Sequence, residues 1–372
     1  MRGLLRLKSQ LKVNHSRLAQ QASGFTLIEL LVGMVISSII LSSLLAFMVN
    51  VLDTERKEQA KSNSEQELQS ALDYIARDLQ QAIYIYDANG LNNNSNTSTP
   101  TSSGIRNQIP PEQPVSNCDK NNTNTVCTPV LVFWKRSPLK QADVPGCTGN
   151  SIDYTVCRDH FLYSLVGYYL LTDKNPNSSS PWSSAARIGR FEIRNGVRSS
   201  SGTITRTETT SASGTSVTNS VKYLLAPDKG FMPFNPSLAA NLPSAMNLWQ
   251  KNAAANENYS GGNFAILVDY IDQSTNNQIP APNATTAANC QNVLQLPTAQ
   301  QVPDYTASNF PSELKTGSFY ACVNNSSPPL AQVFLRGNAL ARINKGATYN
   351  TKQSGYFPTE SVQVKGRGLL GN

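Results

Sequence analysis

Histidine is nearly missing from this chain, and its scarcity limits the chemistry that the chain can perform. The 372 residues include only two histidines, His15 and His160. No Gly-x-Ser-x-Gly elbow, P-loop or dinucleotide-binding fingerprint occurs. A histidine-based triad would depend on His160 alone, and Asp269 and Asp272 would face opposite sides of a predicted strand. The sequence therefore predicts no catalytic residue and no enzymatic activity.

Cysteine is absent from the first 117 residues, and Cys-x-x-Cys pairs are absent throughout. Cys157-Arg158-Asp159-His160 offers one Cys/His pair without a matching second half, so we expect no metal site and no cofactor. Six cysteines in an oxidising compartment suggest up to three disulfides, and fifteen pairings are possible. Sequence proximity favours local loops that join the first two, the middle two and the last two cysteines, which are Cys118, Cys127, Cys147, Cys157, Cys290 and Cys322.

Acidic side chains are missing from residues 1–24, whereas five basic ones are present: Arg2, Arg6, Lys8, Lys12 and Arg17. From Phe25 to Val49 the only charge is Glu29, in a run of apolar and small residues long enough to span a bilayer as a helix. The positive-inside rule places residues 1–24 in the cytoplasm and the remainder outside. A carboxylate within the span is costly, so Glu29 is a candidate functional residue.

The border between the basic leader and the apolar run, Gly24-Phe25-Thr26-Leu27-Ile28-Glu29, resembles the prepilin signal of type IV pilins and type II secretion pseudopilins. The resemblance implies that prepilin peptidase cleaves between Gly24 and Phe25 and methylates the new amine of Phe25. It also implies that Glu29 pairs with an N-terminal amine as the subunit joins other pilin subunits at an inner-membrane assembly platform. The alternative is a plain N-terminal anchor, which needs neither Glu29 nor this junction.

Removal of the leader would change the charge balance. The whole chain has a formal charge of +7, but without the leader 26 basic residues face 24 acidic ones, so the mature charge is near +2. The basic character of the whole chain therefore does not predict a nucleic acid partner.

Proline and glycine are also missing from Asp53 to Tyr86. We therefore predict one long helix, with a membrane or filament-core part at 25–50 and an amphipathic part at 51–87. Arg77 and Asp78 are expected on its solvated face, with at most a weak local pairing. One face carries the apolar residues Leu68, Leu72, Ile75, Leu79 and Ile83.

Two further segments extend the resemblance. Residues Ala71–Ala82 are similar to larger minor pilins and to J-type, PilW-like minor pseudopilins. The run from Phe47 to Asp87, together with Pro129–Arg136, resembles a narrower group, the cyanobacterial HpsC pseudopilins of hormogonium polysaccharide secretion. This resemblance implies a filament that supports polysaccharide secretion and gliding motility. Two alternatives stay open: a minor pilin for adhesion or DNA uptake, and a membrane-tethered extracellular enzyme.

The remainder predicts an α+β, pilin-like fold in which the long helix packs on an antiparallel sheet with long polar loops. Residues 88–128 form a low-complexity polar loop, and 129–372 form a disulfide-containing, β-rich periplasmic head. Further polar tracts, including 199–220, predict loops, and Ser244–Asn252 predicts a short helix. The predicted strands are Val130–Lys135, Phe161–Leu171, Arg187–Arg194, Val221–Leu225, Asn263–Ile271, Ser318–Val323, Ala331–Leu335 and Ala339–Ile343, the last two as a hairpin.

The loops are the expected place for recognition of a partner. Aromatic residues in polar loops, such as Trp182 and Tyr259, are candidates for contact with an exported polysaccharide. The alternative is a solvated loop without a ligand.

Overall fold

The computed structural model describes residues 25–115, 118–121, 124–147, 156–174, 181–212, 215–259, 264–275, 288–308 and 310–367. The predicted leader, with Gly24, lies outside these residues. The chain divides into two compact units, Met1–Glu55 and Arg56–Asn372, and the border lies within helix α1 (Leu27–Gln80). In the first unit every described residue, from Phe25 to Glu55, is exposed and helical from Leu27 onward.

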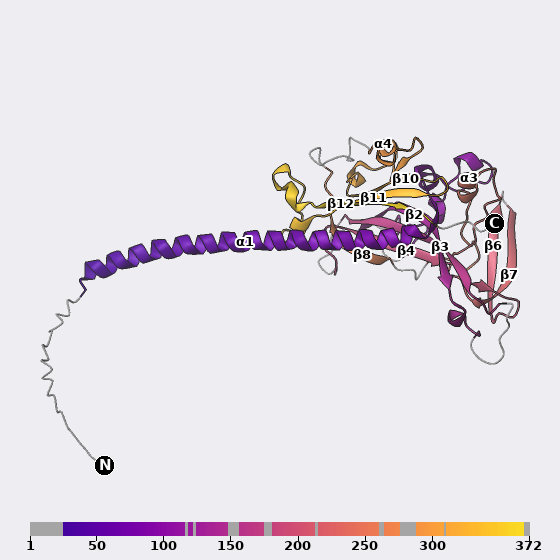
Figure 1. Cartoon of the computed structure of the whole chain (residues 1–372), viewed down its shortest axis with the longest axis horizontal. Coiled ribbons are helices and arrows are strands. Elements are labelled where there is room, and N and C mark those ends of the chain that lie inside the picture. The colour runs from indigo at the N-terminus through magenta and orange to yellow at the C-terminus, as the bar shows by residue number, and fades with distance from the viewer. Residues whose placement is uncertain are drawn as a thin grey trace, which may run out of the picture. The chain divides into compact units, whose positions relative to one another are not determined.

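In the second unit α1 buries one face, as its apolar spacing predicts. Leu68, Leu72, Ile75 and Leu79 lie in the main hydrophobic core together with side chains from the strands of the head (Figure 1). Burial of a side chain of this size stabilises the fold by about 1.5–3 kcal/mol. The described architecture is thus α+β and pilin-like, with an apolar N-terminal helix followed by antiparallel sheets.

The prediction that the helix continues through residue 86 is wrong. α1 ends at Gln80, and the next residues form strand β1 (Ala82–Ile85), which pairs with the first long strand of the head. Ile83, Tyr84, Ile85 and Tyr86 are all buried, so their side chains enter the core on both faces. β-branched and aromatic residues buried on both faces suit a strand better than a helix with one apolar stripe.

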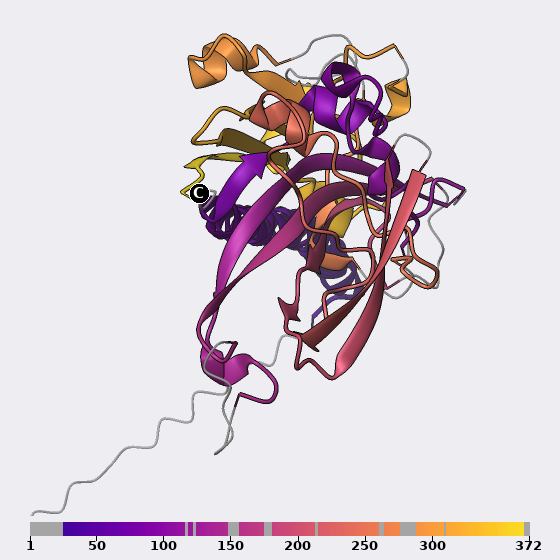
Figure 2. The ribbon, with the colours of Figure 1, turned by 90° about the vertical axis from the view of Figure 1, so that its right-hand side faces the viewer.

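The described residues of the head form three antiparallel sheets (Figures 1 and 2). The five-stranded sheet has the order β1-β2-β3-β4-β8, and its longest members, β2 and β3, pair over most of their length and curve side by side in Figure 2. The four-stranded sheet has the order β12-β11-β10-β9, and the three-stranded sheet has the order β5-β7-β6. The remaining strands are β2 (Thr125–Leu139), β3 (His160–Asp173), β4 (Ala186–Arg194), β5 (Val197–Arg198), β6 (Ile204–Ala212), β7 (Thr215–Leu225), β8 (Ala265–Ile271), β9 (Gln300–Val302), β10 (Phe319–Asn324), β11 (Leu330–Arg336) and β12 (Thr359–Lys365).

The described residues of the polar tract at 88–128 are more ordered than its composition predicts. The tract contains helix α2 (Ala88–Asn92), and Ile105 and Ile109 are buried in the main core. The Asp87 side chain caps α2 by accepting a hydrogen bond from the Gly90 amide over 2.9 Å. A few apolar residues are therefore enough to fix a segment that is otherwise rich in Asn, Ser and Thr.

Two further sequence predictions are wrong. The tract at 199–220 is not a loop, because β6 and β7 form a hairpin there. Ala339–Ile343 is not a strand: residues Ala339–Arg342 form a 3-10 helix, and β11 pairs with β12 instead. The Asn338 side chain accepts from the Ala341 amide over 3.0 Å, which favours a helical turn over a strand. The predicted helix at 244–252 lies earlier, as α3 (Leu242–Met246).

Three disulfides staple the head. The structure joins Cys118 to Cys127, Cys147 to Cys157 and Cys290 to Cys322, which are the pairs of neighbours along the sequence. The last of these connects helix α4 (Cys290–Leu294) to β10. All six cysteines are at least nine-tenths buried, so the bridges belong to the interior of the head.

Candidate functional site

The N-terminal end of α1 carries a reciprocal cap between Thr26 and Glu29. The Thr26 hydroxyl accepts from the Glu29 amide over 3.3 Å. In return, Glu29 Oε2 accepts from the Thr26 amide and from the Thr26 hydroxyl, each over 3.0 Å. This is a capping box, which satisfies backbone donors at the helix start. The Glu29 carboxylate is therefore held against the backbone of Thr26, the residue that follows Phe25.

The cap leaves part of the carboxylate open to a second partner. Both contacts with Thr26 use Oε2, and no donor among the described residues binds Oε1. Phe25 is 85% exposed, so the start of the apolar run is accessible from outside the chain. An amine presented by another molecule can therefore reach Glu29 without breaking the cap.

Small residues form a strip on the helix one turn beyond Glu29. A side chain at Gly33 would meet no atom of this chain within 4 Å, so the fold of the chain itself does not require glycine there. The hydroxyls of Ser37 and Ser38 donate to helix carbonyls over 2.7 and 2.8 Å. Small residues four apart permit close approach of a second helix in an apolar medium.

Asp78 lies at the junction of α1 and the five-stranded sheet, and it is not solvated as the sequence predicted. It is 8% exposed and accepts from Lys135 over 3.0 Å, from Tyr168 over 2.7 Å and from Arg190 over 2.8 Å. Burial alone would raise the pKa of Asp78, but the charges of Arg190 and Lys135 outweigh it and the pKa is lowered. Glu192 completes the cluster by binding Lys135 and Arg190.

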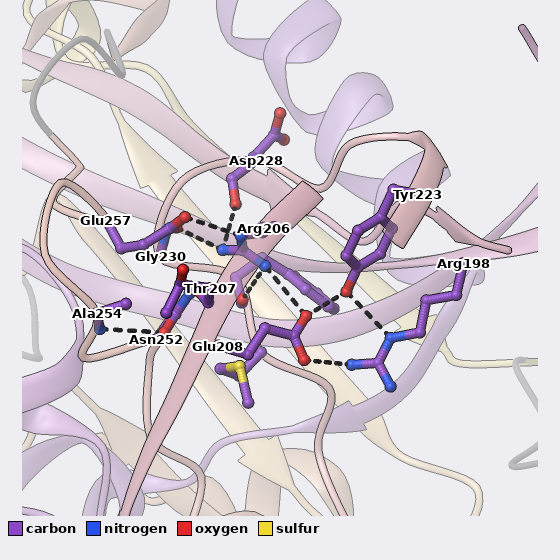
Figure 3. Close-up of polar contacts among 12 residues, drawn as sticks. Arg198, Arg206, Thr207, Glu208, Tyr223, Asp228, Gly230, Asn252, Ala254 and Glu257 are labelled. Atoms are coloured by element: carbon purple, nitrogen blue, oxygen red, sulfur yellow. Dashed lines mark hydrogen bonds and ion pairs between the residues drawn. The ribbon is translucent and has the colours of Figure 1, made fainter. Parts of the chain in front are cut away.

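A second polar cluster lies where the β6–β7 hairpin meets the loops around residues 230 and 257 (Figure 3). The Arg206 guanidinium donates to both carboxylate oxygens of Glu257, at 2.8 and 2.5 Å. Burial would raise the pKa of Glu257, but the hydrogen bonds from Arg206 prevail and lower it. Glu208 binds Arg198 over 2.6 Å and also accepts from the Tyr223 hydroxyl. Each charge in this cluster is paired, so the cluster fixes the hairpin and does not present a reactive group.

Asn252 covers the outer edge of β6. Its Nδ2 donates to the Thr207 carbonyl over 2.9 Å, and its Oδ1 accepts from the Thr209 amide over 2.8 Å. The Ala253 amide then donates to the Thr209 carbonyl over 3.1 Å. The side chain and backbone of this loop thus make the hydrogen bonds of a neighbouring strand, in the part of the hairpin shown in Figure 3.

The residues considered for catalysis or metal binding have other roles. Asp269 accepts from Ser183, and Asp272 accepts from Arg336 over 2.9 Å in a buried ion pair. The His160 ring lies 2.7 Å from the Val156 carbonyl. In the described part of the chain no three His, Cys, Asp or Glu residues gather closely enough to bind a metal ion.

Two pockets of the head are lined mainly by apolar side chains. One, of about 170 Å³, lies among α2, β2 and the segment after β9 and contains Pro110, Pro303 and Phe310. The other, of about 340 Å³, lies beside Tyr223 and contains Phe161 and Phe231. The acidic residue at the first pocket, Glu112, is held by basic partners at 2.7 and 3.8 Å. His160 also lines the second pocket, but among the described lining residues neither pocket places a serine or a free cysteine beside a histidine.

α1 is long and apolar enough to cross a membrane, and its apolar window is exposed throughout. The comparison with known families agrees with this end of the chain. Residues 20–45 match the prokaryotic N-terminal methylation motif, a segment that includes Gly24, Phe25 and Glu29. This match supports a type IV pilin-like prepilin, anchored in the inner membrane through α1. The motif implies processing by prepilin peptidase and assembly with other pilins, as a structural subunit rather than an enzyme. No curated protein and no solved structure matches the chain.

Most residues of these sites were not predicted from the sequence, and two of them carry a local signal that could have identified them. Thr26 was not identified as the partner of Glu29, although the Thr-x-x-Glu spacing is the usual signal of a capping box. Asp78 was placed on the solvated face, although it lies between Ile75 and Leu79 of the buried stripe. Among the aromatic candidates, Tyr259 is 3% exposed and belongs to the core, whereas Trp182 is 42% exposed.

Proposed function

We propose that the protein is a minor pilin or pseudopilin subunit that is cleaved between Gly24 and Phe25, methylated at Phe25, and assembled into a filament through Glu29. The observation that carries this proposal is the methylation motif at residues 20–45 on a helix with one charge in its apolar run. After cleavage, Phe25 would carry the new amine at the cytoplasmic edge of the membrane, with the head on the periplasmic side.

Glu29 supplies the driving force for assembly in this proposal. An unpaired carboxylate in hydrocarbon costs several kcal/mol, and pairing with an amine of a neighbouring subunit offsets much of that cost. The open Oε1 allows this pairing while Oε2 stays on Thr26. The Glu29 carboxylate can meet the amine of a neighbouring subunit at only one position along the filament axis. The pair would therefore also set the register between subunits. The strip at Gly33, Ser37 and Ser38 would then permit close helix contact.

The role of the filament is proposed to be polysaccharide secretion and gliding motility. Support comes from the resemblance of Ala71–Ala82 to large minor pseudopilins, and of Pro129–Arg136 to the HpsC group. A head of three sheets and three disulfides is large for a pilin-like subunit, which favours a minor over a major subunit.

The test is Glu29→Ala in the native host, with Glu55→Ala as the matched control and a peptidase-null strain. Glu55 is an exposed glutamate of the same helix, beyond the apolar run. Leader cleavage is read by mass, assembly by recovery of the head in sheared filaments, and export by released polysaccharide. We expect Glu29→Ala to keep cleavage but to lower filament recovery and polysaccharide at least tenfold.

Other outcomes of this test point elsewhere. Loss of filament recovery with normal polysaccharide would indicate a minor pilin for adhesion or DNA uptake. Wild-type behaviour of Glu29→Ala in every readout would contradict the assembly role and favour a plain anchor or a tethered enzyme.

A further inference from the structure

A groove of about 370 Å³ lies in the head between α1 and β8. One wall is a polar face of α1, and the other is β8, the last strand of the five-stranded sheet, with Trp182 at its rim. All of these residues belong to the unit Arg56–Asn372. The lining residues from α1 are Asn63, Gln66, Glu67 and Ser70, and those from β8 are Ile266, Leu267, Val268 and Asp269.

Trp182 differs from the other tryptophans of the chain. Its side chain is 42% exposed, whereas Trp134 and Trp249 are 0% and 3% exposed and lie in the core. An indole at the rim of a polar groove offers a flat apolar face beside hydrogen-bonding groups. A pyranose ring has the matching chemistry, with a face of C–H groups and a periphery of hydroxyls.

The carboxylates of the groove are already held in place. Asp269 accepts from the Ser183 amide and hydroxyl over 2.8 and 2.6 Å and from the Tyr270 amide over 2.8 Å, which leaves it about one acceptor position. Glu67 accepts from Arg342 over 2.5 Å. Each ionised carboxylate has about four acceptor positions, so both retain capacity for hydroxyl donors. Because these side chains are ordered before any ligand binds, binding need not order them.

The charge of the groove indicates whether it suits an anionic or a neutral polymer. Its described lining residues include two carboxylates and no Lys or Arg, and Arg342, which lies beside the groove, is paired with Glu67. The other polar groups of the lining are amides and a hydroxyl. A polyanion, whether an acidic polysaccharide or a nucleic acid, would find no unpaired basic group among these residues and would lie beside the carboxylate of Asp269. Amides and carboxylates side by side instead suit a neutral ligand that carries many hydroxyl groups.

We propose that the groove between α1 and β8 binds a neutral polysaccharide, with a sugar ring stacked on Trp182 and its hydroxyls bonded to Gln66, Glu67 and Asp269. The proposal rests on the export role proposed above and names the class of polymer. Binding itself can be measured without any filament, so the two proposals can fail separately.

The experiment uses the full chain in phosphatidylcholine nanodiscs that contain no glycolipid or sugar-based detergent. Cellohexaose, maltohexaose and mannohexaose are the neutral probes, and hexagalacturonate is the anionic one. Tryptophan fluorescence reports binding, because Trp182 is the exposed indole, and calorimetry gives the affinity of each variant. Trp182→Ala and Trp182→Tyr test the stacking. Phe161→Ala, an exposed aromatic on β3 outside this groove, is the matched control.

We expect at least one neutral hexasaccharide to bind. Trp182→Ala should weaken it at least tenfold, Trp182→Tyr less than fivefold and Phe161→Ala less than twofold. Thermal unfolding of each variant shows whether the fold is retained. The proposal is overturned if no neutral hexasaccharide binds, if only hexagalacturonate binds, or if Trp182→Ala binds as the wild type does. Glu29→Ala should leave sugar binding unchanged, which separates this test from that of assembly.

Discussion

The Asp78 carboxylate of α1 accepts a hydrogen bond from the Arg190 guanidinium of β4 over 2.8 Å. Both side chains are about one-eighth exposed, so the pair joins the helix to the sheet inside the head. Lys135 binds the other oxygen of the same carboxylate over 3.0 Å. Together with Tyr168 of β3, these residues tie three strands to one position of α1.

Removal of this carboxylate should destabilise the head. Asp78→Ala would leave Glu192 as the one carboxylate that still binds both Arg190 and Lys135. The loss should therefore lie near the lower end of the about 3–5 kcal/mol that breaking a buried ion pair costs. The measurement is urea unfolding of the full-length protein in micelles, followed by tryptophan fluorescence. Asp73→Ala, an exposed aspartate of the same helix, is the control and should change the free energy of unfolding by less than about 0.5 kcal/mol. Equal effects of the two variants would contradict the structural role of Asp78.

The same site predicts a pH dependence. Folding lowers the pKa of Asp78 below its ordinary value of 3.8, so the native state binds this proton more weakly than the unfolded state. The stabilisation is therefore complete above about pH 5 and is lost as the pH falls through the lowered folded value. The difference in stability between the wild type and Asp78→Asn should shrink on acidification from about pH 6 to about pH 3.

The titration of Asp272 should change the stability with pH in the opposite direction to that of Asp78. Burial raises its pKa although Arg336 opposes the shift, so its native state binds the proton more tightly than the unfolded state. Its titration therefore lowers stability as the pH rises from 3.8 through the raised folded value. Relative to Asp272→Asn, the wild type should gain stability as the pH falls across that window. Parallel pH profiles of the two Asn variants would refute the assignment.

Each disulfide should contribute to the free energy of unfolding according to the length of the loop that it closes. The bridge Cys290–Cys322 closes a loop of 32 residues and Cys147–Cys157 one of 10. Chain entropy alone then gives about 3.7 and about 2.7 kcal/mol, respectively. Double Cys→Ala variants, unfolded under oxidising conditions, should rank in that order. A larger loss for the shorter loop would show that local packing, not chain entropy, determines the effect.

Two glycines with the same backbone conformation provide a matched pair. Gly230 has φ +78° and Gly346 has φ +79°. A methyl group at Gly346 would meet no atom within 4 Å, whereas one at Gly230 would overlap the Tyr259 ring. Gly346→Ala should cost about 1–2 kcal/mol from the left-handed backbone alone. Gly230→Ala should cost about 1–3 kcal/mol more from overpacking, and thermal unfolding of both variants measures the difference.

The sequence predicted those helices and strands whose buried faces consist of apolar residues. The stripe from Leu68 to Leu79 is buried as its spacing indicates, and β2, β3 and β4 contain the predicted strands. Val221–Leu225 was predicted as a strand and forms the end of β7. β6 was missed because its buried side is polar: Arg206 and Glu208 point inward and pair with other charges. A rule that assigns strands from alternating apolar residues does not predict a strand whose buried side chains are charged.

The end of α1 was missed for a different reason. No proline or glycine marks it, because the change from helix to strand depends on β1 finding its partner β2, with Ala82 opposite Lys135. That partner lies about fifty residues away in the chain, so local propensity does not contain the information. The processing site was predicted from local sequence, and cleavage between Gly24 and Phe25 stays a prediction because Gly24 lies outside the described residues.

The Asn252 loop has a consequence for the filament assembly that we propose. Copies of a filament subunit meet at a high local concentration, where an open strand edge would offer a second, unwanted way to associate. The Asn252 side chain already binds the backbone groups of Thr207 and Thr209. A strand of another subunit therefore cannot pair with this edge of β6. Growth by stacking of α1 helices, and not by fusion of sheets, is then the route that this part of the head leaves open.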